Sequence, residues 1–204
     1  MVLGIFRKEA RVVTEHDPYT LSTGRLVWRW AWFTMIALGG CTVDLLTKHW
    51  VFQWRGMPSP DNRWWLIEGY VGIEPALNPG ALFGMGAGGG PFFAAVSVFA
   101  AVLILYLIFV RRMVVDPLLS LSLALILGGI LGNLYDRLGL WHPPDAPGQW
   151  RTEVRDWILL CYKQYTWPNF NIADSLLVAG AACLFYHGWF GSSHKSSAQE
   201  PNKK

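Results

Sequence analysis

Two aspartates in the last quarter of the chain have the types and positions that could do chemistry. Asp156 lies in a polar, aromatic-rich segment that we expect to be a loop, and Asp174 lies just inside the start of a long apolar run. A carboxylate at the mouth of a membrane helix is costly and indicates a functional site. Two facing carboxylates resist double ionisation, so they share one proton. One acid can then take a proton from water while the other donates to a carbonyl oxygen, which would cleave a peptide bond.

The composition of the chain favours a membrane protein. Of its 204 residues, 52% are hydrophobic and 15% charged, whereas about 25% of residues are charged in a typical soluble domain. Many of the twelve tryptophans lie beside charges or at the ends of apolar runs, as in an interfacial aromatic belt. A net charge of +3 is too small to indicate a nucleic-acid partner. Cys41, Cys161 and Cys183 show no metal-ligand spacing, so we predict neither a metal nor another cofactor.

Four apolar runs predict the elements that must position these acids, at about 28–47, 91–110, 118–138 and 172–190. Each approaches the ~20 residues that an α-helix needs to cross ~30 Å of hydrocarbon. Glycines and alanines in the third and fourth runs permit close helix packing. The predicted fold class is therefore a membrane protein with an all-α core of four transmembrane helices.

Lysines and arginines predict the orientation. They precede the first run, fill the link at 111–112 and follow the fourth run, and the positive-inside rule places those segments in the cytoplasm. Charges interrupt residues 1–25, so we expect a cytoplasmic tail and no cleavable signal peptide. Residues 26–190 would form the membrane domain, and 191–204 a polar cytoplasmic tail.

Two long loops, at about 49–90 and 139–170, would then face outward. In the first, WWLIEGYVGIEPAL has short mixed runs broken by Gly69, Gly72 and Pro75, which favours a small extracytoplasmic β element. The second begins with WHPPDAPGQW, whose prolines argue against a helix.

Further polar residues lie near the outward ends of the helices. Asp44 and Lys48 are four apart on one helix face, which suits a structural clamp or, alternatively, a site for substrate or a lipid headgroup. Asn133 and Arg137 also share a face, and we interpret them as functional. Asp136 is interpreted as a structural helix-end cap in a solvated ion pair.

The fourth helix opens with a predicted capping box. Asn171 can act as the N-cap, which places Asp174 at the third helical position. Both residues could serve only to start the helix, but the second acid, Asp156, favours a functional site. Asn133, Arg137 and Asn171 are candidate donors that hold the acid pair or the substrate backbone.

Taken together, these pieces resemble the bacterial lipoprotein signal peptidase family, also called signal peptidase II. The matching segments run through most of residues 40–185: DLLTK at 44–48, NPGALF at 78–83, GGILGNLYDR at 128–137, VRDW at 154–157 and FNIAD at 170–174.

The resemblance implies an inner-membrane aspartyl peptidase whose active site lies near the extracytoplasmic face. It would remove signal peptides from diacylglyceryl-modified prolipoproteins, with Asp156 and Asp174 as the catalytic pair. Asn78 and Gly80 match a motif expected to support the pair or the substrate. Membrane lipid and inhibitors of the globomycin type are the further expected partners, and we expect a monomer.

This chain departs from the family pattern in two places. The loop between Arg137 and Asp156 is longer than in typical members, and it contains a competing acid, Asp145. We prefer Asp156 for its flanking residues and for its spacing to Asp174. Trp157 stands where the family usually has Phe.

Three other functions compete with this interpretation. A small transporter or channel with an acidic proton relay would carry polar residues through the membrane depth, whereas here they gather at the outward ends. A presenilin-type protease would need a GxGD motif and more helices. A structural subunit would leave the two acids unexplained.

Overall fold

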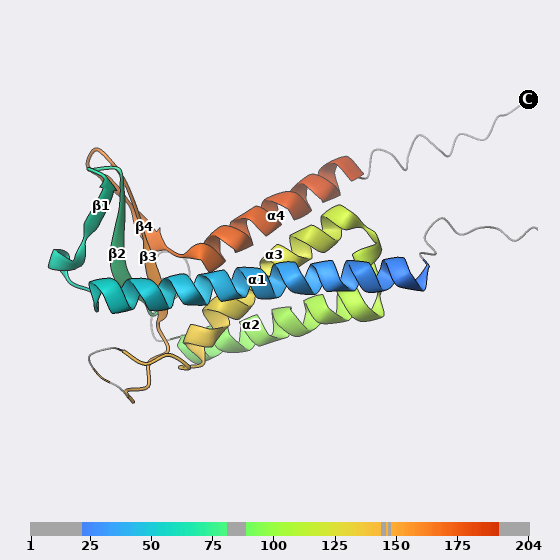
Figure 1. Ribbon diagram of the computed structural model, residues 1–204, viewed down its shortest axis with the longest axis horizontal. Coiled ribbons are helices and arrows are strands. Elements are labelled where there is room, and N and C mark those ends of the chain that lie inside the picture. Colours follow the sequence, from blue (N-terminus) through green and yellow to red (C-terminus); the bar gives the residue numbers. More distant parts are fainter. Residues whose placement is uncertain (1–21, 81–88, 144–145, 147, 192–204) are drawn as a thin grey trace, which may run out of the picture.

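The computed structural model describes residues 22–80, 89–143, 146 and 148–191. Four helices run side by side: α1 Thr23–Arg55, α2 Gly90–Leu105, α3 Pro117–Arg137 and α4 Ile172–Gly191 (Figure 1). All four are long and apolar enough to cross a membrane, α2 together with the π-helical turn η3 Tyr106–Val110 that continues it. The four predicted spans are therefore confirmed.

Helix α1 is longer at both ends than the predicted 28–47. It begins inside the predicted tail, most of which, like 192–204, lies outside the described residues. Beyond the apolar run, buried Val51 and Phe52 keep the chain helical by packing against the rest of the protein. The helix ends at Gly56, whose φ of 80° is a left-handed conformation that glycine adopts without strain.

The two long loops meet in one antiparallel sheet at one end of the bundle (Figure 1). Its strands are β1 Trp64–Ile67, β2 Val71–Asn78, β3 Val154–Tyr162 and β4 Tyr165–Phe170, paired in that order. The β element predicted in the first loop is confirmed. The loop assigned to Asp156 is wrong, because Asp156 lies on β3 opposite Ala76 of β2. That partner strand is distant in sequence, so local pattern did not reveal the pairing.

The rest of the bundle is packed through apolar side chains and glycines. The buried apolar cluster joins α1, α2 and α3 and includes Phe33, Ile104 and Leu127. Helix α4 approaches α3 closely, since a methyl group on Gly129 would lie 2.5 Å from the Ala173 carbonyl oxygen. The start of α1, the end of α4 and the α2–α3 link all lie at the end away from the sheet (Figure 1). The sheet thus covers only one end of the bundle.

Candidate active site

Asn171 stands at the centre of the polar residues at the sheet end. Its side-chain oxygen accepts from the Asp174 amide at 2.9 Å, and Asp174 Oδ2 accepts from the Asn171 amide at 3.1 Å. This reciprocal pair is the predicted capping box, which starts α4 and fixes the Asp174 carboxylate in its first turn. The capping prediction is therefore confirmed.

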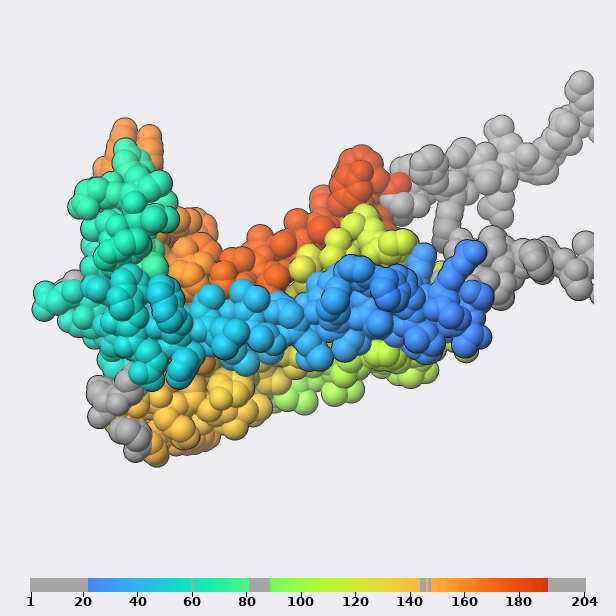
Figure 2. Space-filling model, viewed as in Figure 1, coloured from blue at the N-terminus to red at the C-terminus, as the bar shows by residue number. Residues whose placement is uncertain are grey.

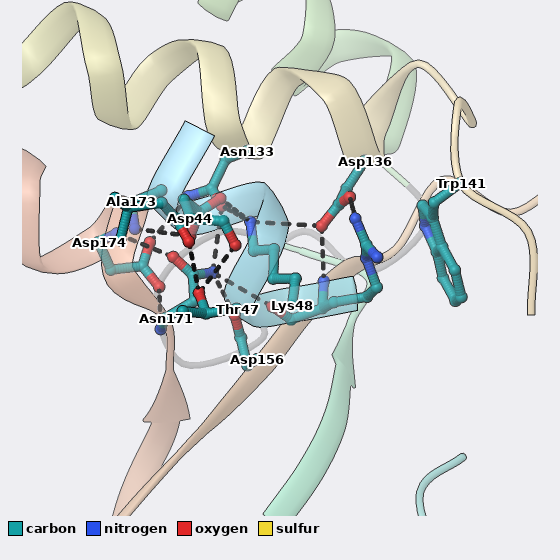
Figure 3. Close-up of polar contacts among 12 residues, drawn as sticks. Asp44, Thr47, Lys48, Asn133, Asp136, Trp141, Asp156, Asn171, Ala173 and Asp174 are labelled. Atoms are coloured by element: carbon teal, nitrogen blue, oxygen red, sulfur yellow. Dashed lines mark hydrogen bonds and ion pairs between the residues drawn. The ribbon is translucent and has the colours of Figure 1, made fainter. Parts of the chain in front are cut away.

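The same asparagine reaches the second acid. Asn171 Nδ2 donates to Asp156 Oδ1 at 2.6 Å, so Asn171 binds both carboxylates, that of Asp156 through its side chain and that of Asp174 through its backbone amide (Figure 3). Asn133 Nδ2 donates to Asp174 Oδ1, the oxygen of Asp174 that does not bind Asn171, at 2.9 Å. The structure thus brings Asp156, Asp174, Asn133 and Asn171 together, as the sequence predicted.

Asp156 lies in surroundings that disfavour its charge. The side chain is only 2% exposed. Burial and then the neighbouring charge of Asp174 raise the pKa of Asp156 to about 7, against hydrogen bonds from Asn171 and Asn78 and the charge of Lys48. The Asp156 carboxyl group can therefore carry a proton near neutral pH, which a general acid requires.

Asp44 and Lys48 form the predicted pair, with Nζ 2.6 Å from Oδ2. Both also reach other helices. Lys48 Nζ donates to Asn133 Oδ1 at 2.8 Å and lies 3.3 Å from Asp136 Oδ2. Asp44 Oδ1 accepts from the Ala173 amide at 2.8 Å, in the first turn of α4. The pair therefore joins α1 to α3 and α4 next to Asn133 and Ala173, which adjoin the Asp174 carboxylate.

Asp136 differs from its predicted state. Instead of a solvated cap, it is fully buried and lies between Lys48 and the backbone and side chain of Arg155. In the amino-acid sequence, Arg155 is one of several basic residues in the two long loops and nothing local marks it as buried. Had the segment been recognised as a strand, alternation would have placed Arg155 on the face opposite Asp156 and so nearer to a buried acid.

Arg137 connects α3 to the segment after β2. Its Nη2 donates to the Gly80 carbonyl oxygen at 2.5 Å, and its guanidinium lies 5.0 Å from the Phe93 ring centroid. The Gly80 amide donates to Asn78 Oδ1 at 3.0 Å, which closes a local turn. Asn78 also interacts with the Asp156 carboxyl group, and Gly80 is connected to the site through Arg137. The competing acid, Asp145, lies outside the described residues.

A groove of about 1320 Å³ opens over these residues. Its polar floor includes Asn133, Arg137, Asp156 and Asp174, and its walls are largely apolar, from α2, α4 and the sheet. Figure 2 shows the molecule hollowed between the sheet and α4. Among the described residues, no three His, Cys, Asp or Glu side chains come together as a metal site would need. The groove can accept an extended apolar ligand and present it to two carboxyl groups.

The fold and the site define an integral membrane protein with a buried acid pair at one end of a four-helix bundle. Residues 36–190 match the family model described as signal peptidase (SPase) II. The chain belongs to the signal peptidase II family, and it is a membrane peptidase.

Relatives and solved structures agree with this assignment. The chain is 52% identical over 157 residues to the lipoprotein signal peptidase of Rhodopirellula baltica, covering 76% of this chain and 70% of that one. It is 34% identical over 154 residues to that of Symbiobacterium thermophilum, covering 75% and 91%. A solved bacterial membrane enzyme shares the fold, with a TM-score of 0.65 at 22% identity over 85% of this chain and 94% of the other.

Proposed function

We propose that this chain is an aspartyl endopeptidase that removes signal peptides from diacylglyceryl-modified prolipoproteins. The observation that carries the proposal is the joining of Asp156 and Asp174 through Asn171 on the floor of one apolar groove. The family, and relatives named lipoprotein signal peptidase, support the same substrate class.

The proposed mechanism assigns the two acids different roles. Asp156, whose pKa is raised to about 7, donates its proton to the carbonyl oxygen of the scissile bond. Asp174 takes a proton from the attacking water, whose oxygen bonds to the carbonyl carbon. Asp174 then gives that proton to the leaving nitrogen, and Asp156 recovers its own from the tetrahedral intermediate as the carbon–nitrogen bond breaks.

The surrounding donors would keep this geometry fixed. Asn133 and Asn171 each hold one carboxylate oxygen by a side-chain amide. Arg137 interacts electrostatically with both acids and lines the groove. A backbone or carbonyl group of the substrate is the natural further acceptor for its guanidinium. Asn78 and Gly80 would shape the same wall of the groove.

The proposed location is the bacterial inner membrane, with the acids near the extracytoplasmic face. Arg25 and Arg29 lie in the first turns of α1, and Arg111 and Arg112 lie in the link between α2 and α3. Both segments are at the end of the bundle away from the sheet (Figure 1), and the positive-inside rule favours a cytoplasmic position for that end. Both tails, 1–25 and 191–204, would then be cytoplasmic. Fusions of alkaline phosphatase after Gly148 should be active, and fusions after Arg112 inactive. The reverse result would invert the proposed orientation.

One experiment tests the activity directly. Purified protein is incubated in detergent or lipid with a diacylglyceryl prolipoprotein, with and without globomycin, and the product is sized. We expect a shortened lipoprotein, and we expect globomycin to occupy the same groove and block its formation. The protein should elute as a monomer with bound membrane lipid. Cleavage of the unlipidated precursor at an equal rate would contradict the proposed substrate class.

The transporter or channel alternative is not favoured. The charged side chains that the structure describes as buried all lie at the sheet end, namely Asp44, Lys48, Asp136, Arg155 and Asp156. A proton relay would need such groups along the depth of the bundle.

A further inference from the structure

The long segment between α3 and β3 places one of its two tryptophans inside the protein. Trp150 is 69% exposed, whereas Trp141 is only 4% exposed. Trp141 Nε1 donates to the Glu153 carbonyl oxygen at 3.3 Å, and its ring meets Phe52 of α1 edge-on, with centroids 5.9 Å apart. The segment is therefore attached to the bundle next to the point where β3 begins.

Arg155 lies between this ring and a buried acid. Its guanidinium carbon is 5.0 Å from the Trp141 ring centroid. Its Nε and Nη2 donate to Asp136 Oδ1 at 3.1 and 2.7 Å, and its backbone amide donates to Asp136 Oδ2 at 3.0 Å. Figure 3 shows Asp136 between Lys48 and Trp141. The Arg155 side chain is thus held on one side by a fork of hydrogen bonds and on the other by an aromatic ring.

The residue that follows Arg155 is Asp156. Neighbouring side chains on a strand point to opposite faces, so Arg155 is fixed on one face of β3 and Asp156 on the other. The Arg155 carbonyl oxygen also lies 3.5 Å from Asn171 Nδ2, the atom that donates to Asp156. Both the amide and the carbonyl of residue 155 are therefore restrained directly beside the acid. A buried ion pair such as Arg155–Asp136 is weak evidence for stability. Its hydrogen bonds do, however, restrict the position of residue 155.

We propose that Trp141 and Arg155 are positioning residues that set the place of Asp156 against Asp174. Asp136 anchors Arg155 to α3, and Trp141 keeps its guanidinium from turning away. This assigns a role to Trp141, near the start of the long segment between α3 and β3. The inference rests on the proposed role of Asp156 as a catalytic acid, and Trp141 and Arg155 touch neither Asp174 nor the substrate in this assignment.

The test compares variants of these two residues with matched controls in the same segment. Trp141→Ala and Arg155→Met are purified beside Trp141→Phe, Arg155→Lys, Trp150→Phe and Arg151→Met. The constants kcat and KM are measured on a fluorogenic diacylglyceryl lipopeptide. The concentration of folded enzyme used to calculate kcat is determined by gel filtration. Displacement of a reacting group by about 1 Å lowers rates by on the order of 10²-fold. We expect a loss of that order in kcat for Trp141→Ala and Arg155→Met, with KM within about twofold of wild type.

The conservative variants separate positioning from folding. Trp141→Phe keeps a ring against the guanidinium and should recover most of the lost kcat, while Arg155→Lys, which lacks the fork, should not. The control variants Trp150→Phe and Arg151→Met should match wild type. Wild-type kcat in folded Trp141→Ala and Arg155→Met would overturn the inference. If Asp156→Asn, tested alongside, keeps full activity, the proposed function fails instead, so the two failures are distinguishable.

Discussion

The two ends of the helix bundle hold their elements together by different means. At the sheet end, buried charges contact one another: Lys48 lies between Asp44 and Asp136, and Arg155 completes the chain. At the opposite end, apolar side chains such as Ile108 and Val114 are fully buried. The polar contacts there lie at the edge, where His187 Nε2 is 2.7 Å from Asp116 Oδ2 and both side chains are partly exposed.

This difference separates the residues that stabilise the fold from the residues that serve the function. Burying a charge is costly, and a buried pair recovers that cost only with good geometry and further hydrogen bonds. In lipid, packing and interhelical hydrogen bonds associate helices, and the apolar end meets this need. The charges at the sheet end therefore indicate chemistry, since stability alone would be served as well by apolar residues.

The largest expected effect breaks the acid pair. Asp156→Asn and Asp174→Asn should each abolish cleavage, because loss of a general acid or base lowers rates by about 10²–10⁴-fold. Both proteins should still accumulate in the membrane, since the amide keeps the size of the side chain. The measurement is the cleavage of a diacylglyceryl prolipoprotein by each purified variant.

Asp145→Asn is the matched control for this pair and should retain activity. Activity lost in Asp145→Asn and kept in Asp156→Asn would show that the wrong acid was chosen.

The second prediction breaks the charge chain itself. Lys48→Met leaves the buried Asp44 and Asp136 carboxylates without their shared cation. Removal of one partner from a buried pair costs about 3–5 kcal/mol, which we expect as a lower free energy of unfolding in a denaturant titration in detergent.

The variant Lys48→Met combined with Asp44→Asn and Asp136→Asn should recover part of that loss, because it removes the stranded charges. If the single variant unfolds at the wild-type denaturant concentration, the charge chain is not a structural connection.

The third prediction concerns the proton on Asp156. Its pKa in the folded protein is raised to about 7 by burial and then by the charge of Asp174. The folded protein therefore keeps this proton between about pH 4 and about pH 7, where the unfolded chain has released it, and wild-type stability falls as pH rises through that window. Asp156→Asn lacks this proton, so its free energy of unfolding should not fall with pH for this reason. Between about pH 5 and about pH 8, the free energy of unfolding of the variant should rise relative to that of wild type by on the order of 1–3 kcal/mol.

Unfolding of both proteins at the two pH values measures this difference. The same proton predicts that wild-type cleavage slows as pH rises above about 7. A difference between the two proteins that does not change with pH would mean that Asp156 is not protonated near neutrality.

The smallest expected effect tests the opposite end. His187→Gln removes a partly exposed pair with Asp116, and such pairs contribute about 0–1 kcal/mol. Thermal unfolding should change slightly, and cleavage should stay at the wild-type rate. A loss of stability comparable with that of Lys48→Met would contradict the distinction between the two ends.

Most of the fold could be predicted because its signals are local. A run of about 20 apolar residues is readable without knowledge of the rest of the chain. The capping box at Asn171 and Asp174 spans four positions, so its geometry was also predictable. The extension of α1 to Arg55 was not, because it depends on the burial of Val51 and Phe52 by other elements.

The amino-acid sequence by itself determined the four spans and the start of α4, and it singled out the two acids that we propose as the catalytic pair. Only the tertiary structure decided that Asp156 lies on a strand, that Asp136 and Arg155 are buried together, and that Asp44 binds the Ala173 amide 129 positions away. The physical reason is that burial and pairing depend on segments far apart in the chain, whereas apolar runs and caps depend on neighbours. A charged residue such as Asp136 is therefore predicted to be solvated as long as its partner, distant in sequence, is not known.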